Sequence, residues 1–345
     1  MKVLLSATLV PFMRGGAELH IDGVSRALRE HGHEVELLRL PFRFSPESAI
    51  HHAMAHASSL DMQAPNGIEI DRAISLQFPA WGIQHPHHTV WVMHQHRACY
   101  ELWQENDVNE ETKALKDAVH AFDQRHLGQA QALFANSQRV AERLATHNGL
   151  TATPLYHPPH GAERFYTDEA WDYIFYPSRL ERLKRQDLLI EAARHLKSPV
   201  KIIIAGEGGQ REYYQQLIER YQLQHRVTLI GRVSEAEKLA WYAHSLAVFF
   251  GPHDEDYGYI TLEAMLAAKP VITCRDSGGP LEFVAHDATG WITEPEARAV
   301  AHAIDTAWEN KAQSADMGRE GQAAYHRAGI SWHNVVARLL GEEGA

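Results

Sequence analysis

Short apolar runs alternate along the chain with longer segments in which apolar residues recur every three or four positions. The apolar runs predict strands at 2–9, 33–40, 73–79, 89–94, 132–137, 173–179, 201–208, 226–233, 246–252 and 270–276. The longer segments predict helices, among them 17–31, 108–130, 185–196, 210–223, 234–244 and 259–268. Buried strands that alternate with helices of this length are typical of parallel sheets covered on both faces.

The alternation occurs twice, and a segment rich in proline, glycine and polar residues at 157–171 separates the two series. No periodic pattern crosses this segment, as is typical of a linker between domains. We therefore expect an α/β protein of two Rossmann-like, doubly wound parallel-sheet domains, an N-terminal one over 1–160 and a second over 161–328. We also expect a C-terminal helix within 329–345 that packs back on the N-terminal domain.

Composition and charge narrow the classes of partner. The chain has 345 residues, of which 45% are hydrophobic, and a formal net charge of −11. An acidic chain is poorly suited to bind a phosphate backbone, so no nucleic-acid partner is expected. The sequence has no polybasic segment and no long uninterrupted apolar run, so we expect at most peripheral membrane contact. Its two cysteines, Cys99 and Cys274, lie far apart, which favours a reducing compartment such as the cytoplasm.

Ligands of open α/β sheets bind beyond the carboxyl ends of the strands, so candidate residues should directly follow the predicted strands. Gly15 and Gly16 follow the first strand and open a helix, where backbone N–H groups could approach a phosphate. Arg179 and Lys184 follow the first strand of the second series, and a planar fork of donors beside a mobile point charge suits a diphosphate. The residues alone leave open a simple glycine turn in the first case and a solvated basic helix start in the second.

The stretch EDYGYITLE places Glu255 in an acidic loop after a strand and Glu263 about one turn into the following helix. A carboxylate can accept two hydrogen bonds from a vicinal diol, and the helix N-terminus between the two glutamates offers N–H donors to a phosphate. An acidic loop before an ordinary helix would explain the same spacing. Residues 231–233 end another predicted strand, where their backbone groups could contact a base.

In their order and spacing these motifs resemble the family four retaining glycosyltransferases, or glycosyl transferases group 1, which have the GT-B architecture of two domains facing a central cleft. The R-L-x-x-x-K pattern of the family resembles SRLERLK at 178–184, and its E-x(7)-E signature resembles EDYGYITLE at 255–263. Further resemblances are SGGPLE at 277–282, TGWIT at 289–293, GGAE at 15–18, MHQH at 93–96 and ANS at 135–137. Together they span nearly the whole chain.

The resemblance implies a role for each matching residue. It implies catalytic roles for Glu255, His94, Arg179 and Lys184. It implies donor contacts for Gly16, Arg179, Lys184, Gly231, Arg232, Val233, Tyr257, Gly258, Tyr259, Ile260 and Glu263. Glu263 would hold the ribose and Glu255 the hydroxyls of the transferred sugar, while the basic pair would bind the departing diphosphate. The histidine would approach the donor sugar from the other domain.

The implied reaction moves a sugar from a UDP- or GDP-sugar to a hydroxyl of a glycan, lipid-linked or small-molecule acceptor, as in cell-envelope or polysaccharide synthesis. No cofactor and no divalent metal are implied, because the basic pair supplies the positive charge. The sequence departs from the family pattern at Arg185, where a glycine often follows the lysine. It also has Tyr257–Tyr259 in place of the usual Phe–Gly–Leu, and both departures could bear on donor choice.

Three alternatives stay open. Histidines gather at 50–56 and 85–96, and His52 and His56 could share a helix face and bind zinc, although no HExxH pattern or cysteine set accompanies them. A GT-B nucleotide-sugar epimerase would release an altered nucleotide sugar without an acceptor. A catalytically silent, nucleotide-sugar-binding partner subunit would bind the same ligand, but the complete set of charged residues argues against it.

Overall fold

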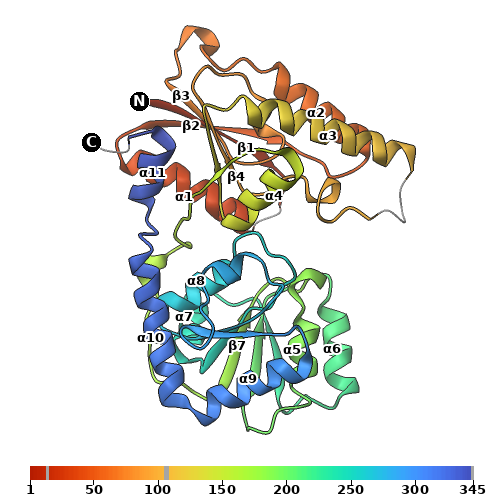
Figure 1. The fold of residues 1–345 in the computed structure, drawn as a ribbon, viewed down its shortest axis with the longest axis vertical. Helices are drawn as coiled ribbons and strands as arrows, with labels where there is room; N and C mark the ends of the chain where they lie inside the picture. Colours follow the sequence, from red (N-terminus) through yellow and green to blue (C-terminus); the bar gives the residue numbers. More distant parts are fainter. Residues whose placement is uncertain (13–14, 105–108, 343–345) are drawn as a thin grey trace. The chain divides into compact units, whose positions relative to one another are not determined.

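The computed structural model of the protein describes residues 1–12, 15–104 and 109–342. The chain divides into two compact units, each shown in Figure 1. Unit 1 comprises Met1–His160 together with the segment that begins at Ser331, and unit 2 comprises Gly161–Ile330. The sequence predicts domain boundaries after residues 160 and 328.

Unit 1 is built on a six-stranded parallel sheet with the strand order β2-β1-β3-β4-β5-β6. The strands are β1 Lys2–Leu9, β2 Glu34–Pro41, β3 Arg72–Ser75, β4 His88–Val92, β5 Ala132–Ala135 and β6 Thr153–Pro154. Residues 3–8 of β1 are all buried although successive side chains point to opposite faces, so both faces of this strand are covered. The strand order reverses at β1, which makes the β1–β3 junction a topological switch point.

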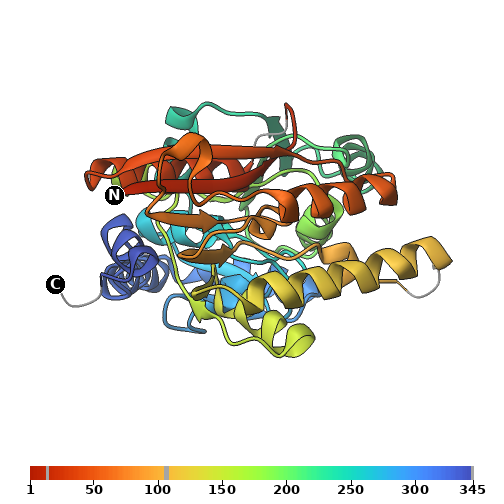
Figure 2. The same ribbon diagram turned by 90° about the horizontal axis from the view of Figure 1, so that it is seen from above.

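Helices cover this sheet, namely α1 Gly16–Glu30, α2 Glu47–Ser59, α3 Glu110–Gly128 and α4 Gln138–Asn148. Figures 1 and 2 both show α2 and α3 side by side, and the two helices are in contact. Asn109 begins α3 with a capping box, because its side chain accepts a hydrogen bond from the backbone N–H of Thr112 and the Thr112 hydroxyl accepts one in return. Gly149 ends α4 with a φ of 63°, in the left-handed conformation that suits glycine.

The last helix, α11 Trp332–Leu340, packs on α1 of unit 1. Its apolar residues join the cluster that contains Leu5 of β1, and they are Val335, Val336, Leu339 and Leu340. Trp332 lies against Gly23 of α1, where a β-carbon would come 2.4 Å from the indole ring. Glycine at position 23 therefore allows the two helices to approach each other.

Unit 2 is built on a second six-stranded parallel sheet, with the order β12-β11-β10-β7-β8-β9. Its strands are β7 Tyr173–Pro177, β8 Lys201–Ala205, β9 Val227–Gly231, β10 Ala247–Phe249, β11 Val271–Cys274 and β12 Gly290–Thr293. The chain runs outward from β7 through β8 to β9 and then returns to pair β10 with the other side of β7. The junction of β7 and β10 is therefore the topological switch point of this unit.

The helices of unit 2 are α5 Gln186–Ala192, α6 Arg211–Arg220, α7 Glu235–His244, α8 Tyr259–Leu266, α9 Ala297–Glu309 and α10 Lys311–Arg327. Helix α5 packs between α6 and α9, and α8 packs against α10. Ser234 and Glu237 form the capping box of α7 that their spacing predicts.

Every predicted strand is present, but most end two to four residues earlier than their apolar runs. Side-chain burial continues past the last ladder hydrogen bond, because the loops at the carboxyl edge are themselves packed. Among residues 1–12, 15–104 and 109–342, no helix combines the length and the hydropathy that crossing a membrane requires.

Candidate active site

The site residues predicted in unit 2 lie along the carboxyl edge of its sheet. Arg179 and Lys184 follow β7, and Glu255 follows β10, its neighbour across the switch point. Residues 231–233 stand at the end of β9, the edge strand. Three strand spacings separate β9 from β10, or about 14 Å at the usual spacing. The candidate residues therefore line a span that suits an extended ligand rather than a single small group.

Lys184 and Glu255 meet across the switch point. The Lys184 ammonium forms an ion pair with Oε2 of Glu255, and 16% and 22% of the two side chains are exposed. The same ammonium lies 5.9 Å from the centroid of the Phe250 ring. Limited contact with water strengthens the attraction between the two charges. The structure thus brings together two residues that the sequence analysis assigns to neighbouring parts of one ligand.

Buried groups of unit 2 fix the backbone that carries Lys184. The hydroxyl of Tyr176, a fully buried residue of β7, donates a hydrogen bond to the carbonyl of Lys184. The side-chain amide of Gln186, also fully buried, donates to the carbonyl of Arg179 at 2.8 Å. Burial, and after it the charge of Glu255, raises the pKa of Tyr176 well above its ordinary value, so the hydroxyl stays protonated.

The glycines of the SGG motif support the loop that carries Glu255. The N–H of Glu255 donates to the carbonyl of Ser277 at 2.9 Å, and the N–H of Gly279 donates to the carbonyl of Glu255 at 2.8 Å. Gly278 has a φ of 72°, and a β-carbon there would come 2.5 Å from the Glu255 carbonyl oxygen. Glycine at this position is therefore required both by the backbone conformation and by the approach of the two loops.

The N-terminus of α8 lies between the two glutamates of the EDYGYITLE stretch. Gly258 precedes the helix with a φ of 88°, and as a glycine it has no side chain that could cap the first turn. Tyr257 is buried, and its ring lies 5.1 Å from that of Tyr259 in an edge-to-face arrangement. Ile260, in the first turn, is buried as well. The N-terminus of α8, with the partial positive charge of the helix dipole, therefore suits an anionic ligand.

Helix α7 holds the carboxylate of Glu263. The Tyr242 hydroxyl donates to Oε2 of Glu263 at 2.6 Å, and the Lys238 ammonium donates to Oε1 at 3.2 Å. Glu263 is 9% exposed and Tyr242 is fully buried. Burial acts to lower the pKa of Lys238, but Glu263 and Glu235 outweigh it and raise that pKa above its ordinary value. The carboxylate is thus fixed in one orientation, and each oxygen keeps a lone pair for a further donor.

Two predicted arginines of this edge are exposed. The side chain of Arg179 makes no ion pair or hydrogen bond with the described residues, and Arg232 is likewise exposed beside Val233, which is half-buried. The carbonyl of Gly231 accepts a hydrogen bond from the N–H of Gly206 at 2.7 Å, which ties the ends of β8 and β9 together.

The predicted site residues of unit 1 lie at the carboxyl edge of its sheet. Gly16 begins α1 after an extended Gly15, and residues 13–14 of the predicted glycine loop lie outside the described residues. His94 stands two residues after β4, and its Nδ1 lies 2.8 Å from the carbonyl oxygen of Gln95. A carbonyl can only accept, so Nδ1 carries the proton and Nε2 is left as an acceptor in the neutral ring.

A buried carboxylate fixes the residue next to His94. The Gln95 amide donates to Oδ2 of Asp123 at 3.1 Å, the Tyr100 hydroxyl donates to the same oxygen at 2.8 Å, and the Trp81 indole donates to Oδ1 at 3.0 Å. Asp123 is fully buried, and burial raises its pKa to about 6 although the three donors lower it.

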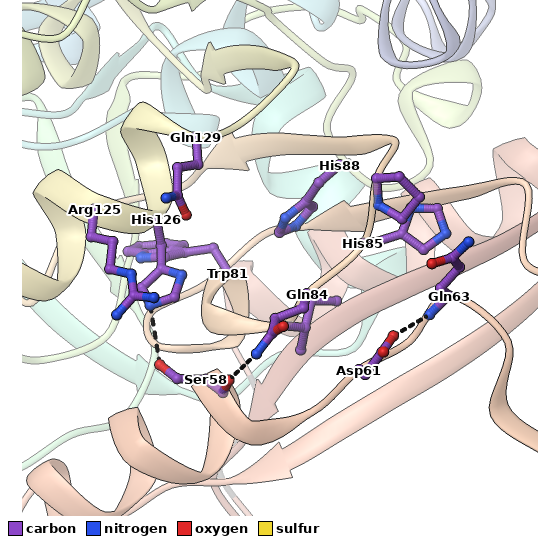
Figure 3. A pocket seen from close by; sticks show the side chains of 12 residues that line it. Ser58, Asp61, Gln63, Trp81, Gln84, His85, His88, Arg125, His126 and Gln129 are labelled. Carbon is purple, nitrogen blue, oxygen red and sulfur yellow. Dashed lines mark hydrogen bonds between the residues drawn. The ribbon is translucent and has the colours of Figure 1, made fainter.

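Two histidines of the 85–96 cluster, His85 and His88, line a separate hollow of about 440 Å³ in unit 1, shown in Figure 3. It lies between the start of β4 and the end of α3, at the amino edge of the sheet and therefore opposite the candidate site residues. Within it, His88 Nε2 lies 2.7 Å from the Ser75 hydroxyl, and His126 Nε2 lies 3.0 Å from that of Ser58. These histidines are engaged by neighbouring hydroxyls.

The zinc alternative rests on His52 and His56 of α2. The described part of the chain contains no group of three or more His, Cys, Asp or Glu side chains arranged to hold a metal ion. The structure therefore gives that alternative no set of ligands among the residues that it describes.

The residues that position the site were not predicted from the sequence. Lys238 and Tyr242 stand four apart on α7, so the helical period places them on one face, and this spacing could have identified the pair. Tyr176 and Gln186 carry no such signal, because their contacts are with backbone carbonyls.

Solved structures share the fold over nearly the entire chain. Sucrose-phosphate synthase from Thermosynechococcus elongatus superposes with a TM-score of 0.79 at 16% identity, covering 99% of this chain and 98% of that one. HepE from Anabaena, in a complex with UDP and glucose, gives 0.71 at 20% identity, covering 99% and 100%. Two six-stranded parallel sheets with flanking helices, together with these neighbours, define the GT-B glycosyltransferase fold that the sequence predicts.

Sequence comparison finds similarity to one family. Residues 164–324, nearly all of unit 2, match the model of the glycosyl transferases group 1 family. The human alpha-1,3/1,6-mannosyltransferase ALG2 is 32% identical over 42% of this chain, and the D-inositol 3-phosphate glycosyltransferase of Pseudarthrobacter chlorophenolicus is 25% identical over 75% of it. The chain spans 39% and 64% of the lengths of these two relatives.

Proposed function

We propose that the protein is a retaining, metal-independent glycosyltransferase that moves a sugar from a UDP- or GDP-sugar to a hydroxyl of a glycan, lipid-linked or small-molecule acceptor. The observation that carries the proposal is the ion pair of Lys184 and Glu255 at the switch point of unit 2, next to the N-terminus of α8. The names of the two relatives and the UDP in the HepE complex support sugar transfer from a nucleotide donor.

The donor would lie along the carboxyl edge of the second sheet. The base would contact residues 231–233, and Glu263 would accept hydrogen bonds from the ribose diol. The diphosphate would bind Arg179, Lys184 and the first turn of α8, where a planar fork, a point charge and the positive end of a helix dipole would meet one anion. Glu255 would accept hydrogen bonds from hydroxyls of the transferred sugar.

In the proposed reaction the bond between the anomeric carbon and the diphosphate oxygen breaks, and its electron pair leaves with the diphosphate. The acceptor hydroxyl attacks the oxocarbenium-like sugar from the same face, and its proton passes to the departing phosphate oxygen, so configuration is retained. The cations beside the leaving group stabilise this charge separation more than the ground state, which lowers the barrier. Glu255 orients the sugar and is not assigned as a covalent nucleophile.

Unit 1 would bind the acceptor. Two of its residues would also contact the donor. His94 would contact the donor sugar through Nε2, since its Nδ1 is engaged by the Gln95 carbonyl. Gly16 would contact the phosphates at the start of α1.

Thermal stabilisation by UDP, GDP, ADP and dTDP, each with and without EDTA, tests the donor site. We expect one nucleotide to raise the melting temperature selectively, and we expect EDTA to leave that shift unchanged. A chain that no nucleotide stabilises would contradict the donor site, and a shift that EDTA removes would contradict metal independence.

The variant Glu255→Gln tests the proposed role of Glu255 in orienting the transferred sugar. It should lower sugar transfer by roughly 10²–10³-fold while nucleotide binding persists, because the ribose and diphosphate contacts are intact. Glu294→Gln, an exposed glutamate of the same unit, is the matched control. A Glu255→Gln enzyme with the wild-type rate would disprove this role. Release of an altered nucleotide sugar without an acceptor would instead indicate an epimerase, and binding without turnover a silent subunit.

A further inference from the structure

Arg185 directly follows Lys184 and has a backbone conformation that disfavours its own side chain. Its φ of 53° and ψ of 45° lie in the left-handed region, where glycine fits best. The family pattern that the sequence resembles often has glycine at this position. A residue that keeps a β-carbon in this conformation indicates that the side chain compensates for the strain.

The guanidinium of Arg185 makes four hydrogen bonds. Nη1 and Nη2 each donate to one carboxylate oxygen of Asp276, both at 2.8 Å, in the bidentate geometry that arginine favours. Nε donates to the carbonyl of Gly251 at 2.8 Å, and Nη2 donates to that of Pro252 at 2.6 Å. The side chain is 18% exposed. With its donors engaged in this way, Arg185 is a poor candidate for a donor-phosphate contact.

These bonds join three loops at the carboxyl edge of the sheet. Arg185 belongs to the loop of Lys184, Gly251 and Pro252 begin the loop of Glu255, and Asp276 belongs to the loop of the SGG motif. The three loops follow β7, β10 and β11, which are consecutive strands of the sheet. The guanidinium therefore crosses the switch point beside the Lys184–Glu255 pair.

We propose that Arg185 is a positioning residue that fixes Lys184 against Glu255 by holding these three loops together. This inference rests on the proposed function. A misplacement of about 1 Å at reacting groups can cost on the order of 10²-fold in rate. The contacts of Glu263 with α7 are made on other elements, so nucleotide binding should depend much less on Arg185.

The variant Arg185→Gly removes the side chain and suits the backbone conformation, so it should fold. We expect kcat to fall by roughly 10–100-fold, and the Kd of the free nucleotide to rise by a smaller factor, because the proposed contacts of Glu263 and residues 231–233 with the nucleotide do not depend on Lys184. The kcat of Arg185→Lys should lie between those of the wild type and Arg185→Gly. A lysine ammonium can reach Asp276 but cannot reproduce the two parallel hydrogen bonds of the guanidinium. Adding Asp276→Asn to Arg185→Gly should cause little further loss, since both changes break the same contact.

The matched control is Arg275→Ala, which removes an arginine of the adjoining loop that is exposed and paired with Glu294 at 2.7 Å. It should leave kcat unchanged. Hydrogen–deuterium exchange of the unliganded full chain gives a second readout, independent of activity. Arg185→Gly should speed exchange in the peptides around 179–186, 250–258 and 275–279, and Arg275→Ala should not.

Wild-type kcat together with wild-type exchange in Arg185→Gly would overturn the inference. So would a uniform loss of stability and nucleotide binding, which would show a general structural role instead. If the wild-type chain neither binds nucleotides nor transfers sugar, the proposed function fails, and the exchange experiment still decides whether Arg185 holds the three loops.

Discussion

Glu263 is a buried carboxylate whose orientation depends on two donors from a neighbouring helix, the Tyr242 hydroxyl and the Lys238 ammonium. Tyr242→Phe removes the shorter of the two hydrogen bonds and leaves an oxygen of Glu263 without that donor. A hydrogen bond to a charged group contributes about 1.5–3 kcal/mol, so we expect the free energy of unfolding to fall by about that amount. The affinity for the stabilising nucleotide should also weaken, which isothermal titration calorimetry would measure.

Tyr325→Phe is the matched control for this change. Tyr325 is another buried tyrosine of unit 2, and its hydroxyl makes no hydrogen bond with the described residues. Its removal should therefore change neither stability nor nucleotide affinity by a comparable amount. Equal effects of the two variants would show that the Tyr242 hydroxyl has no particular role at Glu263.

At the scale of residues, the sequence identifies charged groups by their spacing but does not show what they contact. The seven-residue interval between Glu255 and Glu263 identifies both glutamates because a loop and a helix turn place them at one edge. The orientation of the Arg185 side chain could not be predicted, because it depends on Asp276, which lies 91 positions further along the chain.

At the scale of elements, ten of the strands were predictable, because both faces of each sheet are covered and most of these strands are therefore nearly continuous apolar runs, whereas the short edge strands β6 and β12 were not among them. Helices α4, α9 and α10 were not named from the sequence pattern, and α2 only through the spacing of His52 and His56. In α10 the reason is physical: it contains Gly318 and Gly321, which weaken a helix. A β-carbon at Gly318 would lie 2.0 Å from the carbonyl oxygen of Ala268. Tertiary packing thus requires a glycine that local propensity disfavours.

The contact of α1 with α11 gives a prediction at the same scale. A β-carbon at Gly23 would overlap the Trp332 ring, so Gly23→Val should displace α11 and lower the free energy of unfolding by about 1–3 kcal/mol, as overpacked cores do. Hydrogen exchange in the peptide that contains Trp332 should become faster, which mass spectrometry would detect.

Gly128→Ala is the control, because a β-carbon at this helical glycine of α3 would meet its nearest neighbour, Leu150, at 3.8 Å. It should be neutral or slightly stabilising. Unchanged exchange around Trp332 in Gly23→Val would mean that α11 does not depend on this close approach.

At the scale of the whole molecule, unit 1 should be sensitive to acid. Burial lowers the pKa of His20 to about 3, and burial is also the main cause that lowers those of His88 and His96 to about 4. Because these folded-state values lie below the ordinary 6.5, the unfolded chain takes up protons first. The contribution of these neutral histidines to the free energy of unfolding is therefore complete above pH 6.5, and it is lost as the pH falls from 6.5 toward 4. For His88 the loss approaches about 3 kcal/mol.

Asp123 opposes this trend in part, because its raised pKa of about 6 makes its contribution more favourable as the pH falls from 6 toward 3.8. Hydrogen exchange at pH 7 and pH 5, corrected for intrinsic rates, would measure the net effect by peptide. We expect protection in unit 1 to decline, and His88→Asn to show a smaller decline than the wild type. Unit 1 protection that is the same at both pH values would contradict this expectation.

The place of α11 has a consequence for how the protein is made. The first unit includes the last helix of the chain, so its apolar cluster is incomplete while the ribosome translates the whole of unit 2. Domains generally fold in the order of their synthesis, but the apolar cluster of unit 1 cannot be completed before unit 2 has been translated. The surface of α1 around Gly23 therefore stays uncovered until α11 has left the exit tunnel. A chaperone would therefore find the most apolar surface to cover after unit 1 has been synthesised and before α11 is available.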